Sequence, residues 1–213
     1  MEILLDGSVS RLGVSVSTSV LDDVLVKGSR KEAFRALERD LKVQMRERFG
    51  TLDDVKDDQT VRALRNFYWK IGIDPTKTRP SSEAILRRLL KKELPMINNL
   101  VDAGNLASAK TIVPVGIYDL DKVVGGAVIR MSREGEEFIG IGDKVVELPA
   151  DIPVLADDEG VIHLYPHRDS MRTRITEDCK RALLVSCGAP GIKKKLLVAT
   201  LKEVEYYWRQ LRV

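Results

Sequence analysis

The sequence predicts an α+β fold in which a layered β-sheet core is packed against several helices. Two patterns indicate this class. Apolar residues recur at helical spacing between residues 29 and 110, and from residue 111 onward short β-rich segments alternate with turn residues. With 213 residues, of which 44% are hydrophobic, the chain can bury a substantial core. We therefore expect a compact arrangement of sheets and helices.

The first element expected is a strand, because valine and serine alternate over Val14–Val20 with the period of a strand that has one face in water. A helix should follow, since Ser29 and Glu32 form a capping box. Apolar residues then recur at helical spacing at Phe34, Leu37, Leu41, Met45 and Phe49. This pattern predicts an amphipathic helix that ends at Gly50.

Two more helices are expected before residue 93. One runs from about Asp58 to Ile71. Two X-Pro pairs between residues 74 and 80 then favour extended backbone, after which Ser81 or Ser82 can cap the next helix. That helix has an apolar stripe on one side and basic residues on the other, namely Arg87, Arg88, Lys91 and Lys92.

A fourth helix, from about Asn98 to Lys110, carries a polar stripe. Asn98, Asp102 and Asn105 fall at positions i, i+4 and i+7, so they share one side of the helix. Such a stripe can line a pocket, or it can form a structural network that caps the helix and ties down a neighbouring loop. Asn98 and Asp102 fit both interpretations.

The second half of the chain is expected to form short strands separated by turns. The strand segments are Ile112–Tyr118, Val123–Met131, Phe138–Ile141, Val145–Leu148, Ile152–Leu155, Val161–Tyr165 and Ala182–Ser186. After a Gly-Ala-Pro-Gly turn at residues 188–191, an apolar periodicity predicts a closing amphipathic helix.

Charge and hydropathy exclude few function classes. The 35 basic and 32 acidic residues give a net charge of +3, so an RNA-binding role must rest on local clusters of charge. No run approaches the roughly 18 apolar residues of a membrane span, and the first residues lack the pattern of a signal peptide. We therefore expect a cytoplasmic protein with no membrane partner.

No metal or other cofactor is expected. The two cysteines, Cys179 and Cys187, cannot complete a structural zinc site by themselves. His163 and His167 are four residues apart, but they straddle a predicted strand and the Pro166 turn, so they do not share a helix face. His163 is expected on a strand face, and His167 near a pocket as an acid-base or positioning group.

Two ordered motifs carry a family resemblance. Residues 95–105, Pro-Met-Ile-Asn-Asn-Leu-Val-Asp-Ala-Gly-Asn, resemble the Pro-Ile-Asn-Asn-Val-Val-Asp-x-Thr-Asn motif of the B3/B4 editing domain in bacterial phenylalanyl-tRNA synthetase β chains. Residues 114–122 resemble the Pro-Leu-His-Ala-Phe-Asp-Leu-Asp-Lys segment of that family. The similarity extends over roughly Trp69 to Val185, and the amino-terminal helices resemble stand-alone versions of the domain.

The resemblance implies an activity and a domain organisation. The family domain hydrolyses tyrosine wrongly esterified to the transfer RNA for phenylalanine, and free-standing relatives deacylate other mischarged transfer RNAs. We expect one domain over residues 1–213, with 1–71 a strand plus helical extension, 72–188 the B3/B4-like core and 189–213 the last helix. The expected partner is aminoacyl-tRNA, with an aminoacyl-tRNA synthetase as a further partner and no DNA.

Departures from the family pattern bear on the substrate. The family pocket contains a Thr-Asn pair, a histidine and a glutamate. Asn105 matches the asparagine, whereas Gly104 replaces the threonine, Gly116 replaces the histidine, and Arg168 or Asp169 lies near the glutamate position. The glycines remove side-chain volume and Asp169 supplies a negative charge, so the sequence predicts a long or cationic amino acid in place of tyrosine.

The candidate site residues fall into three groups. The catalytic candidates are Asn105, His167 and Asp169. The substrate-binding candidates are Asn98, Asp102, Gly104, Gly116, Tyr118, Arg168 and Thr173. The RNA-binding candidates are Lys77, Arg79, Arg87, Arg88, Lys91, Lys92, Arg172 and Arg174, although any single basic cluster is also typical of a solvated helix face.

Two alternative functions fit the sequence. Loss of the family histidine at Gly116 is compatible with a non-catalytic tRNA-binding or synthetase-accessory module. A third interpretation is a sensor that binds free amino acids without RNA. Because an aminoacyl ester is already reactive, hydrolysis needs mainly a positioned water and donors for the oxyanion, so the absence of a nucleophile motif does not exclude an enzyme.

Overall fold

A computed structural model describes residues 1–142 and 144–212, and its helices agree closely with the sequence pattern. The α-helices are α1 (Gly7–Ser10), α2 (Lys31–Arg48), α3 (Gln59–Lys70), α4 (Ser81–Lys91), α5 (Asn99–Thr111) and α6 (Lys194–Leu211). Two short 3-10 helices, η1 (Asp54–Asp57) and η2 (Leu120–Lys122), complete the set. No helix in the described part of the chain is long and apolar enough to cross a membrane.

The strands form two main sheets and a hairpin. The first sheet has the order β1 (Ile3–Leu5), β4 (Ala127–Met131), β7 (Pro153–Asp157), β8 (Gly160–Leu164) and β9 (Arg168–Asp169). The second has the order β2 (Ser15–Leu21), β10 (Ala182–Gly188) and β3 (Val115–Asp119), all antiparallel. The hairpin consists of β5 (Glu136–Gly140) and β6 (Lys144–Leu148). The α+β prediction is confirmed.

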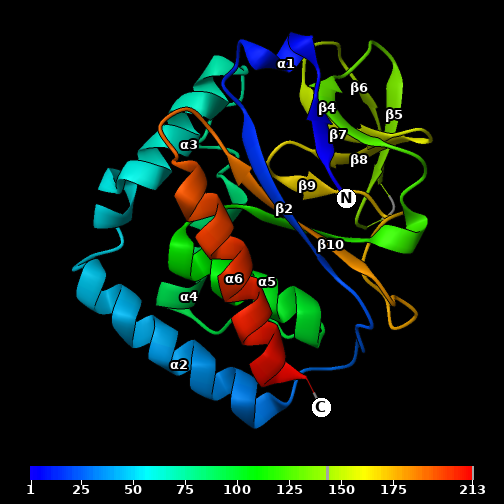
Figure 1. The fold of residues 1–213 in the computed structure, drawn as a ribbon. Helices are drawn as coiled ribbons and strands as arrows, with labels where there is room; N and C mark the ends of the chain where they lie inside the picture. Colours follow the sequence, from blue (N-terminus) through cyan, green and yellow to red (C-terminus); the bar gives the residue numbers. More distant parts are fainter. Residues whose placement is uncertain (143, 213) are drawn as a thin grey trace.

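The elements stack in layers (Figure 1). The β2-β10-β3 sheet lies in the middle, with α2, α4, α5 and α6 on one face and the β1-β4-β7-β8-β9 sheet on the other. Alternation along β10 explains this, because Leu184 points into the helical core whereas Leu183 and Val185 point into the core between the sheets. A smaller core around Phe138 holds the β5-β6 hairpin on the outer face.

Side chains cap two helices in the structure, whereas the caps predicted for two other helices are absent. Asp58 caps α3, and Asn98 caps α5 by accepting hydrogen bonds from the Leu100 and Val101 amides. Ser29 does not cap α2, because its hydroxyl donates to Oδ2 of Asp102 at 2.6 Å. At α4 the N-cap is Pro80, so neither Ser81 nor Ser82 caps it.

The amino-terminal residues contribute to both sheets. β1 pairs in parallel with β4, and β2 pairs with β10 along its whole length. Helix α3 packs its Leu64, Phe67 and Tyr68 side chains into the core between the sheets. The two initial strands are thus integral to the layered core. The division at residues 71 and 188 stays a prediction.

Candidate functional site

A pocket of about 310 Å³ opens at the free edge of β3. Helix α5 forms one wall, β3 the floor, and the segment around β9 the opposite wall. Its lining residues are Ile97, Val101, Gly104, Asn105, Val115, Ile117, Ile141, Asp169, Arg174 and Ile175. The volume is at the small end of ligand sites, and the lining is mostly aliphatic with a few polar groups, as is usual for sites that take small organic ligands. The pocket thus joins the amide-bearing helix to the segment near residue 169.

Asp169 brings a fixed carboxylate to this pocket. The β8-β9 register places it opposite His163, on the same face of the sheet. Nδ1 of His163 lies 2.8 Å from Oδ1 of Asp169, and the Asp169 side chain is 33% exposed. The histidine itself is buried. The negative charge of Asp169 therefore has one buried partner and one side open to the pocket.

Asn105 supplies an amide to the same pocket. It is half-buried on α5 next to Gly104, and its side chain makes no hydrogen bond with the described residues. An amide has two donor protons and one acceptor oxygen, so all of its hydrogen-bonding capacity remains for a ligand. Of the three catalytic candidates, Asn105 and Asp169 line the pocket.

The two glycines do not enlarge the pocket as expected. A Cβ at Gly116 would overlap the hydroxyl oxygen of Tyr118, and a Cβ at Gly104 would lie 2.6 Å from Cδ1 of Ile117. The volume that the family side chains would occupy is therefore filled by neighbouring residues of β3. Gly104 still borders the pocket, whereas Gly116 and Tyr118 face the core between the sheets.

Tyr118 is a buried neighbour of the pocket and does not line it. Its hydroxyl has no hydrogen-bond partner among the described residues, and its ring packs edge-on against the His163 ring. Burial, reinforced by the negative charge of Asp169, raises the pKa of Tyr118 well above its usual value. The phenol therefore stays protonated.

Asn98 and Asp102 lie outside the pocket and hold the start of α5 in place. Asn98 is the helix cap. Asp102 is fully buried and accepts hydrogen bonds from the Ser29 hydroxyl at 2.6 Å and the Ile97 amide at 2.9 Å. Burial raises the pKa of Asp102, and these two bonds oppose the shift. Of the two interpretations that the sequence allowed for Asn98 and Asp102, the structural network fits these contacts.

His167, Arg168 and Thr173 also lie outside the lining of the pocket. His167 packs against Tyr68 of α3, and burial lowers the pKa of His167 to about 4, so the ring is neutral at pH 7. Arg168 points to the other face of its strand and lies over the Phe138 ring. Thr173 is fully buried beside Ser170.

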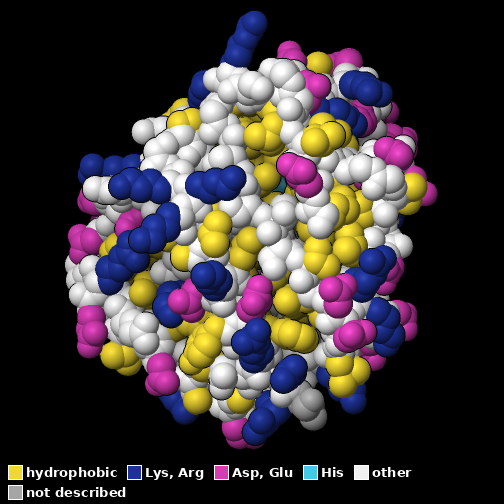
Figure 2. Space-filling model, in the orientation of Figure 1, with side chains coloured by type: hydrophobic (Ala, Val, Ile, Leu, Met, Phe, Trp, Pro, Cys, Tyr) yellow, Lys and Arg dark blue, Asp and Glu magenta, His cyan; other side chains and the backbone are white. Residues whose placement is uncertain are grey.

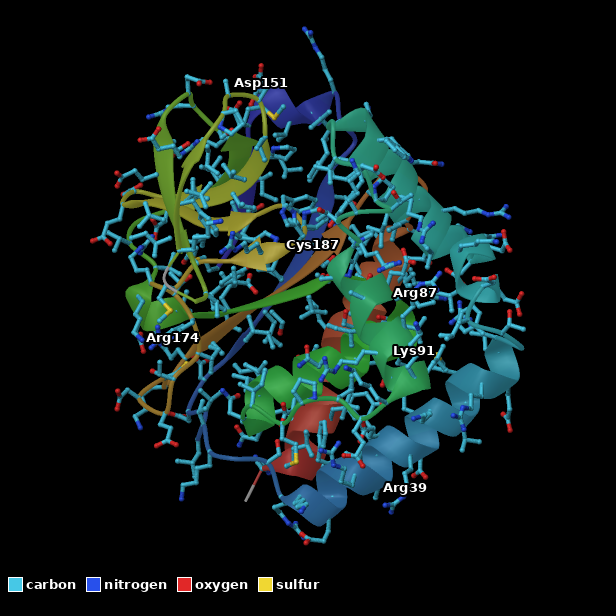
Figure 3. The ribbon with its side chains drawn as sticks, turned by 180° about the vertical axis from the view of Figure 1, so that it is seen from behind. Arg39, Arg87, Lys91, Asp151, Arg174 and Cys187 are labelled. Carbon is cyan, nitrogen blue, oxygen red and sulfur yellow. The ribbon has the colours of Figure 1, made fainter. Side chains whose placement is uncertain are left out.

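The basic candidates separate into two regions. Arg79, Arg87, Arg88, Lys91 and Lys92 line a shallow hollow on α4, and Lys77 is exposed in the preceding loop. Figure 3 shows Arg87 and Lys91 on α4, with Arg174 at the opposite side of the view. Arg174 lines the pocket, so it is the predicted RNA contact nearest to the candidate chemistry.

Two of these arginines are already paired within the protein. Arg87 and Arg65 both bind the buried carboxylate of Glu83, at 2.7 and 2.5 Å. Arg172 pairs with Asp157 at 2.6 Å and donates to the Lys122 carbonyl. The charges of Arg87 and Arg172 are therefore partly neutralised, whereas Arg79, Arg88, Lys91 and Lys92 form no ion pair with described residues.

A larger hollow of about 570 Å³ lies elsewhere, between β1 and β2. It contains none of the candidate residues, and its lining mixes strand backbone with Leu4, Leu5 and Val198. Figure 2 shows this side of the molecule, where hydrophobic side chains surface near β1 and β2 and basic side chains gather over α3 and the start of α6. No group of three or more metal-binding side chains occurs among the described residues.

The sequence did not indicate that His163 contacts Asp169. His163 does lie on a strand, β8, as the sequence predicts, but a two-residue strand such as β9 has no periodic signal from which its partner strand could be inferred. The sequence pattern also did not indicate the exposed rim residues Ile97 and Ile141, which are 58% and 55% exposed at the pocket. The Pro166 turn between β8 and β9 was the available hint of a hairpin.

Comparison with known proteins places the chain beside one family. The family model described as the B3/4 domain matches residues 63–203. The phenylalanine–tRNA ligase β subunit of Bartonella henselae is 31% identical over 140 residues, covering 65% of this chain and 17% of the relative. That of Aquifex aeolicus is 31% identical over 119 residues, covering 56% of this chain and 15% of the relative. The chain thus spans only a small part of these relatives.

A solved structure gives a weaker match. An amino-terminal fragment of the phenylalanyl-tRNA synthetase β subunit from Pyrococcus horikoshii superposes with a TM-score of 0.44 and 18% identity. The match covers 53% of this chain and 40% of that fragment.

Proposed function

The chain belongs to the B3/4 domain family, and from this premise we propose that it is a trans-acting hydrolase that removes the amino acid from mischarged aminoacyl-tRNA. The observation that carries the proposal is the pocket between α5 and β9, in which the Asn105 amide and the Asp169 carboxylate both keep hydrogen-bonding capacity for a ligand. The proposed location is the cytoplasm, where charged transfer RNA is used.

The proposed reaction is attack of water on the aminoacyl ester. Water adds to the carbonyl carbon, the bond from that carbon to the ribose oxygen breaks, and the ribose oxygen takes a proton. The Asn105 amide, which is unpartnered among the described residues and lines the pocket, is suited to donate to the oxyanion as it forms. A ribose hydroxyl of the substrate can assist proton transfer. His167 lies outside the lining and is neutral, so its proposed part is limited to supporting the β8-β9 turn.

The pocket chemistry supports a long or cationic amino acid as the group removed. Val101, Val115 and Ile117 provide aliphatic walls for methylene groups, and Asp169 offers a negative charge for an amine or guanidinium. Since Ile117 and Tyr118 fill the space beside the glycines, this preference rests on Asp169 and the aliphatic walls, not on added volume.

Basic side chains are proposed to hold the acceptor stem. Arg174 at the pocket is suited to the phosphate of the terminal nucleotide, and the hollow on α4 to backbone phosphates farther away. Arg87 and Arg172 contribute less direct charge because both are paired internally. A synthetase that releases mischarged transfer RNA remains a proposed partner.

The decisive experiment follows ester loss from separately mischarged transfer RNAs. We expect deacylation of arginyl, lysyl or other long-chain esters and little effect on correctly charged tyrosyl-tRNA. Preference for the tyrosyl ester with no activity on cationic esters would refute the substrate assignment. Binding of every transfer RNA without any ester loss would refute the hydrolase and favour a tRNA-binding or synthetase-accessory module.

A second candidate function is favoured by the opposite charges in the pocket. Asp169 and Arg174 both line it, and a free amino acid carries an ammonium and a carboxylate that match this pair. An amino-acid sensor would therefore bind free arginine or lysine in calorimetry without affinity for any transfer RNA. Binding that requires the nucleic acid would exclude this alternative.

A further inference from the structure

The pair formed by His163 and Asp169 connects the buried interior to the pocket. Asp169 is on β9 and lines the pocket, whereas His163 lies behind it on β8 with only 5% of its surface exposed. The Nδ1 to Oδ1 distance of 2.8 Å is that of a strong hydrogen bond between a ring nitrogen and a carboxylate. The pair is separate from Asn105, which approaches the pocket from α5.

The histidine is held firmly by its surroundings. The rings of Tyr118 and Tyr165 each pack edge-on against it, with centroids 6.1 Å away in both cases. An ionised carboxylate can only accept hydrogen bonds, so Nδ1 must carry the proton and donate it to Asp169. Nε2 is buried without a hydrogen-bond partner among the described residues. The hydrogen bond to Asp169 is therefore the one polar contact that orients this ring.

The same hydrogen bond also fixes the carboxylate. Oδ1 of Asp169 faces the histidine, the Tyr118 hydroxyl lies near the same carboxylate, and the Asp169 side chain is 33% exposed at the pocket. A carboxylate restrained at one oxygen loses less conformational freedom when the other oxygen binds a ligand. In many metal-binding and catalytic sites, a neighbouring residue holds the functional side chain in place through a hydrogen bond. Here His163 would hold Asp169 in this way for recognition of a cation.

We propose that His163 is a positioning residue for substrate recognition, which orients Asp169 so that its Oδ2 binds an ammonium or guanidinium group of the ligand. The ligand is identified as an aminoacyl ester only through the proposed function on which this inference rests. The cation has two possible sources in such a substrate, the α-ammonium group and a basic side chain. Both have the chemistry that Asp169 recognises.

The test uses amino-acid amides, which cannot be hydrolysed, and measures their affinity for the full chain by calorimetry. Lysinamide carries both cations, norleucinamide carries only the α-ammonium, and Nα-acetyl-lysinamide carries only the side-chain ammonium. Loss of a hydrogen-bonded charge pair is expected to weaken binding about 10- to 100-fold. The amide that binds weakly lacks the cation that Asp169 recognises. Weak binding of norleucinamide therefore indicates the side-chain ammonium, and weak binding of Nα-acetyl-lysinamide indicates the α-ammonium. Equal affinity for all three, and for Nα-acetyl-norleucinamide, would overturn the inference.

Three variants separate positioning from a merely structural role. Asp169→Asn should abolish the preference for the cation, and His163→Phe, which keeps an aromatic ring between Tyr118 and Tyr165 but removes Nδ1, should reduce it by about 5- to 10-fold. His163→Asn places an amide nitrogen near the Nδ1 position and should restore it. A structural role would lower the affinity of charged and uncharged amides together and would not be rescued by asparagine.

The outcomes also distinguish this inference from the proposed function. Deacylation by the wild-type protein combined with unchanged cation preference in His163→Phe would overturn only the role of His163. Cation-selective binding that depends on His163, without deacylation of any transfer RNA, would support His163 and overturn the hydrolase. If His163→Phe does not fold, the ratio of affinities in His163→Asn against His163→Leu decides the question in the same way.

Discussion

The first turn of α5 and the pocket two turns later contain similar polar residues in different states. At the start of the helix, Asn98 accepts two backbone hydrogen bonds and Asp102 accepts two more, from Ser29 and Ile97. At the pocket, Asn105 makes none with the described residues and Asp169 uses only Oδ1. Because unsatisfied polar groups are rare inside proteins, residues with remaining capacity are the better candidates for ligand contacts.

This difference shows why a matched motif is an incomplete guide to a site. Asn98, Asp102 and Asn105 lie on one helical stripe, yet the first two stabilise the fold and only the third reaches the pocket. The fold requires the first two side chains, whereas the proposed ligand requires the third. Mutations can separate them, since one kind should change stability and the other activity.

Replacing Asn105 should have the largest effect, and it should fall on catalysis. Removing one oxyanion donor typically costs about 100- to 1,000-fold in rate, or about 2.7–4 kcal/mol. Asn105→Ala is expected to lose at least 100-fold in deacylation, while its free energy of unfolding changes by less than about 0.5 kcal/mol. Asn105→Asp, which keeps the volume but not the donor, is the matched variant. Normal turnover in either variant would remove Asn105 from the proposed mechanism.

Replacing Asp102 should instead destabilise the fold. Asp102→Ala removes the buried carboxylate that accepts from the Ile97 amide and the half-buried Ser29 hydroxyl, which we expect to cost about 1–2 kcal/mol in urea unfolding. Any loss of activity should follow the unfolded fraction and recover under stabilising conditions. A fully folded but inactive Asp102→Ala protein would contradict the structural role.

The same residue gives a pH dependence with a defined sign. Burial raises the pKa of Asp102 above its unfolded value, so the folded state binds the proton more tightly. The stability that this group contributes is present below the unfolded pKa and is lost as the pH rises through the raised folded pKa. Wild type should therefore gain stability relative to Asp102→Asn on acidification from pH 7 to pH 4, measured by urea unfolding at each pH.

The sequence predicted the elements well because each has a strong local signal. Hydrophobic periodicity located α2, α3, α5 and α6, and alternation between turns located most of the strands. It missed β1 and β9, which have three and two residues and exist only through their partner strands. Ser29 was assigned to the wrong role because capping is a local rule, whereas its partner Asp102 is 73 residues away.

The site was harder to predict because its shape depends on packing between distant residues. The family pattern located Asn105 and the segment near Asp169, and the pocket joins them. It did not indicate that Tyr118 fills the space beside Gly116, since the two residues belong to the same strand face and only the three-dimensional packing shows the overlap. The contact between His163 and Asp169 was missed for a similar reason, because it depends on the register between β8 and β9.

Alanine at the two glycines provides a smaller test of where the pocket ends. At Gly116 the added Cβ would overlap the fully buried Tyr118 hydroxyl, so Gly116→Ala should destabilise the protein by about 1–3 kcal/mol. At Gly104 it would meet only the flexible end of Ile117, and the gain in helix propensity is up to about 1 kcal/mol. Gly104→Ala should therefore stay folded but push Ile117 toward the pocket, and raise KM for long-chain esters. Equal unfolding curves for the two variants would contradict this placement.

The basic hollow on α4 should give the smallest effect per residue. Lys91 and Lys92 are exposed and form no ion pair with described residues, so each is suited to neutralise one phosphate. Each Lys→Ala change should weaken tRNA binding by a few-fold at low salt and reduce the slope of log affinity against log salt concentration by about one. Lys202→Ala, which removes an exposed charge from α6, controls for net charge. If the three variants share one slope, nucleic acid does not contact α4, and phosphate recognition would rest on Arg174 beside the pocket.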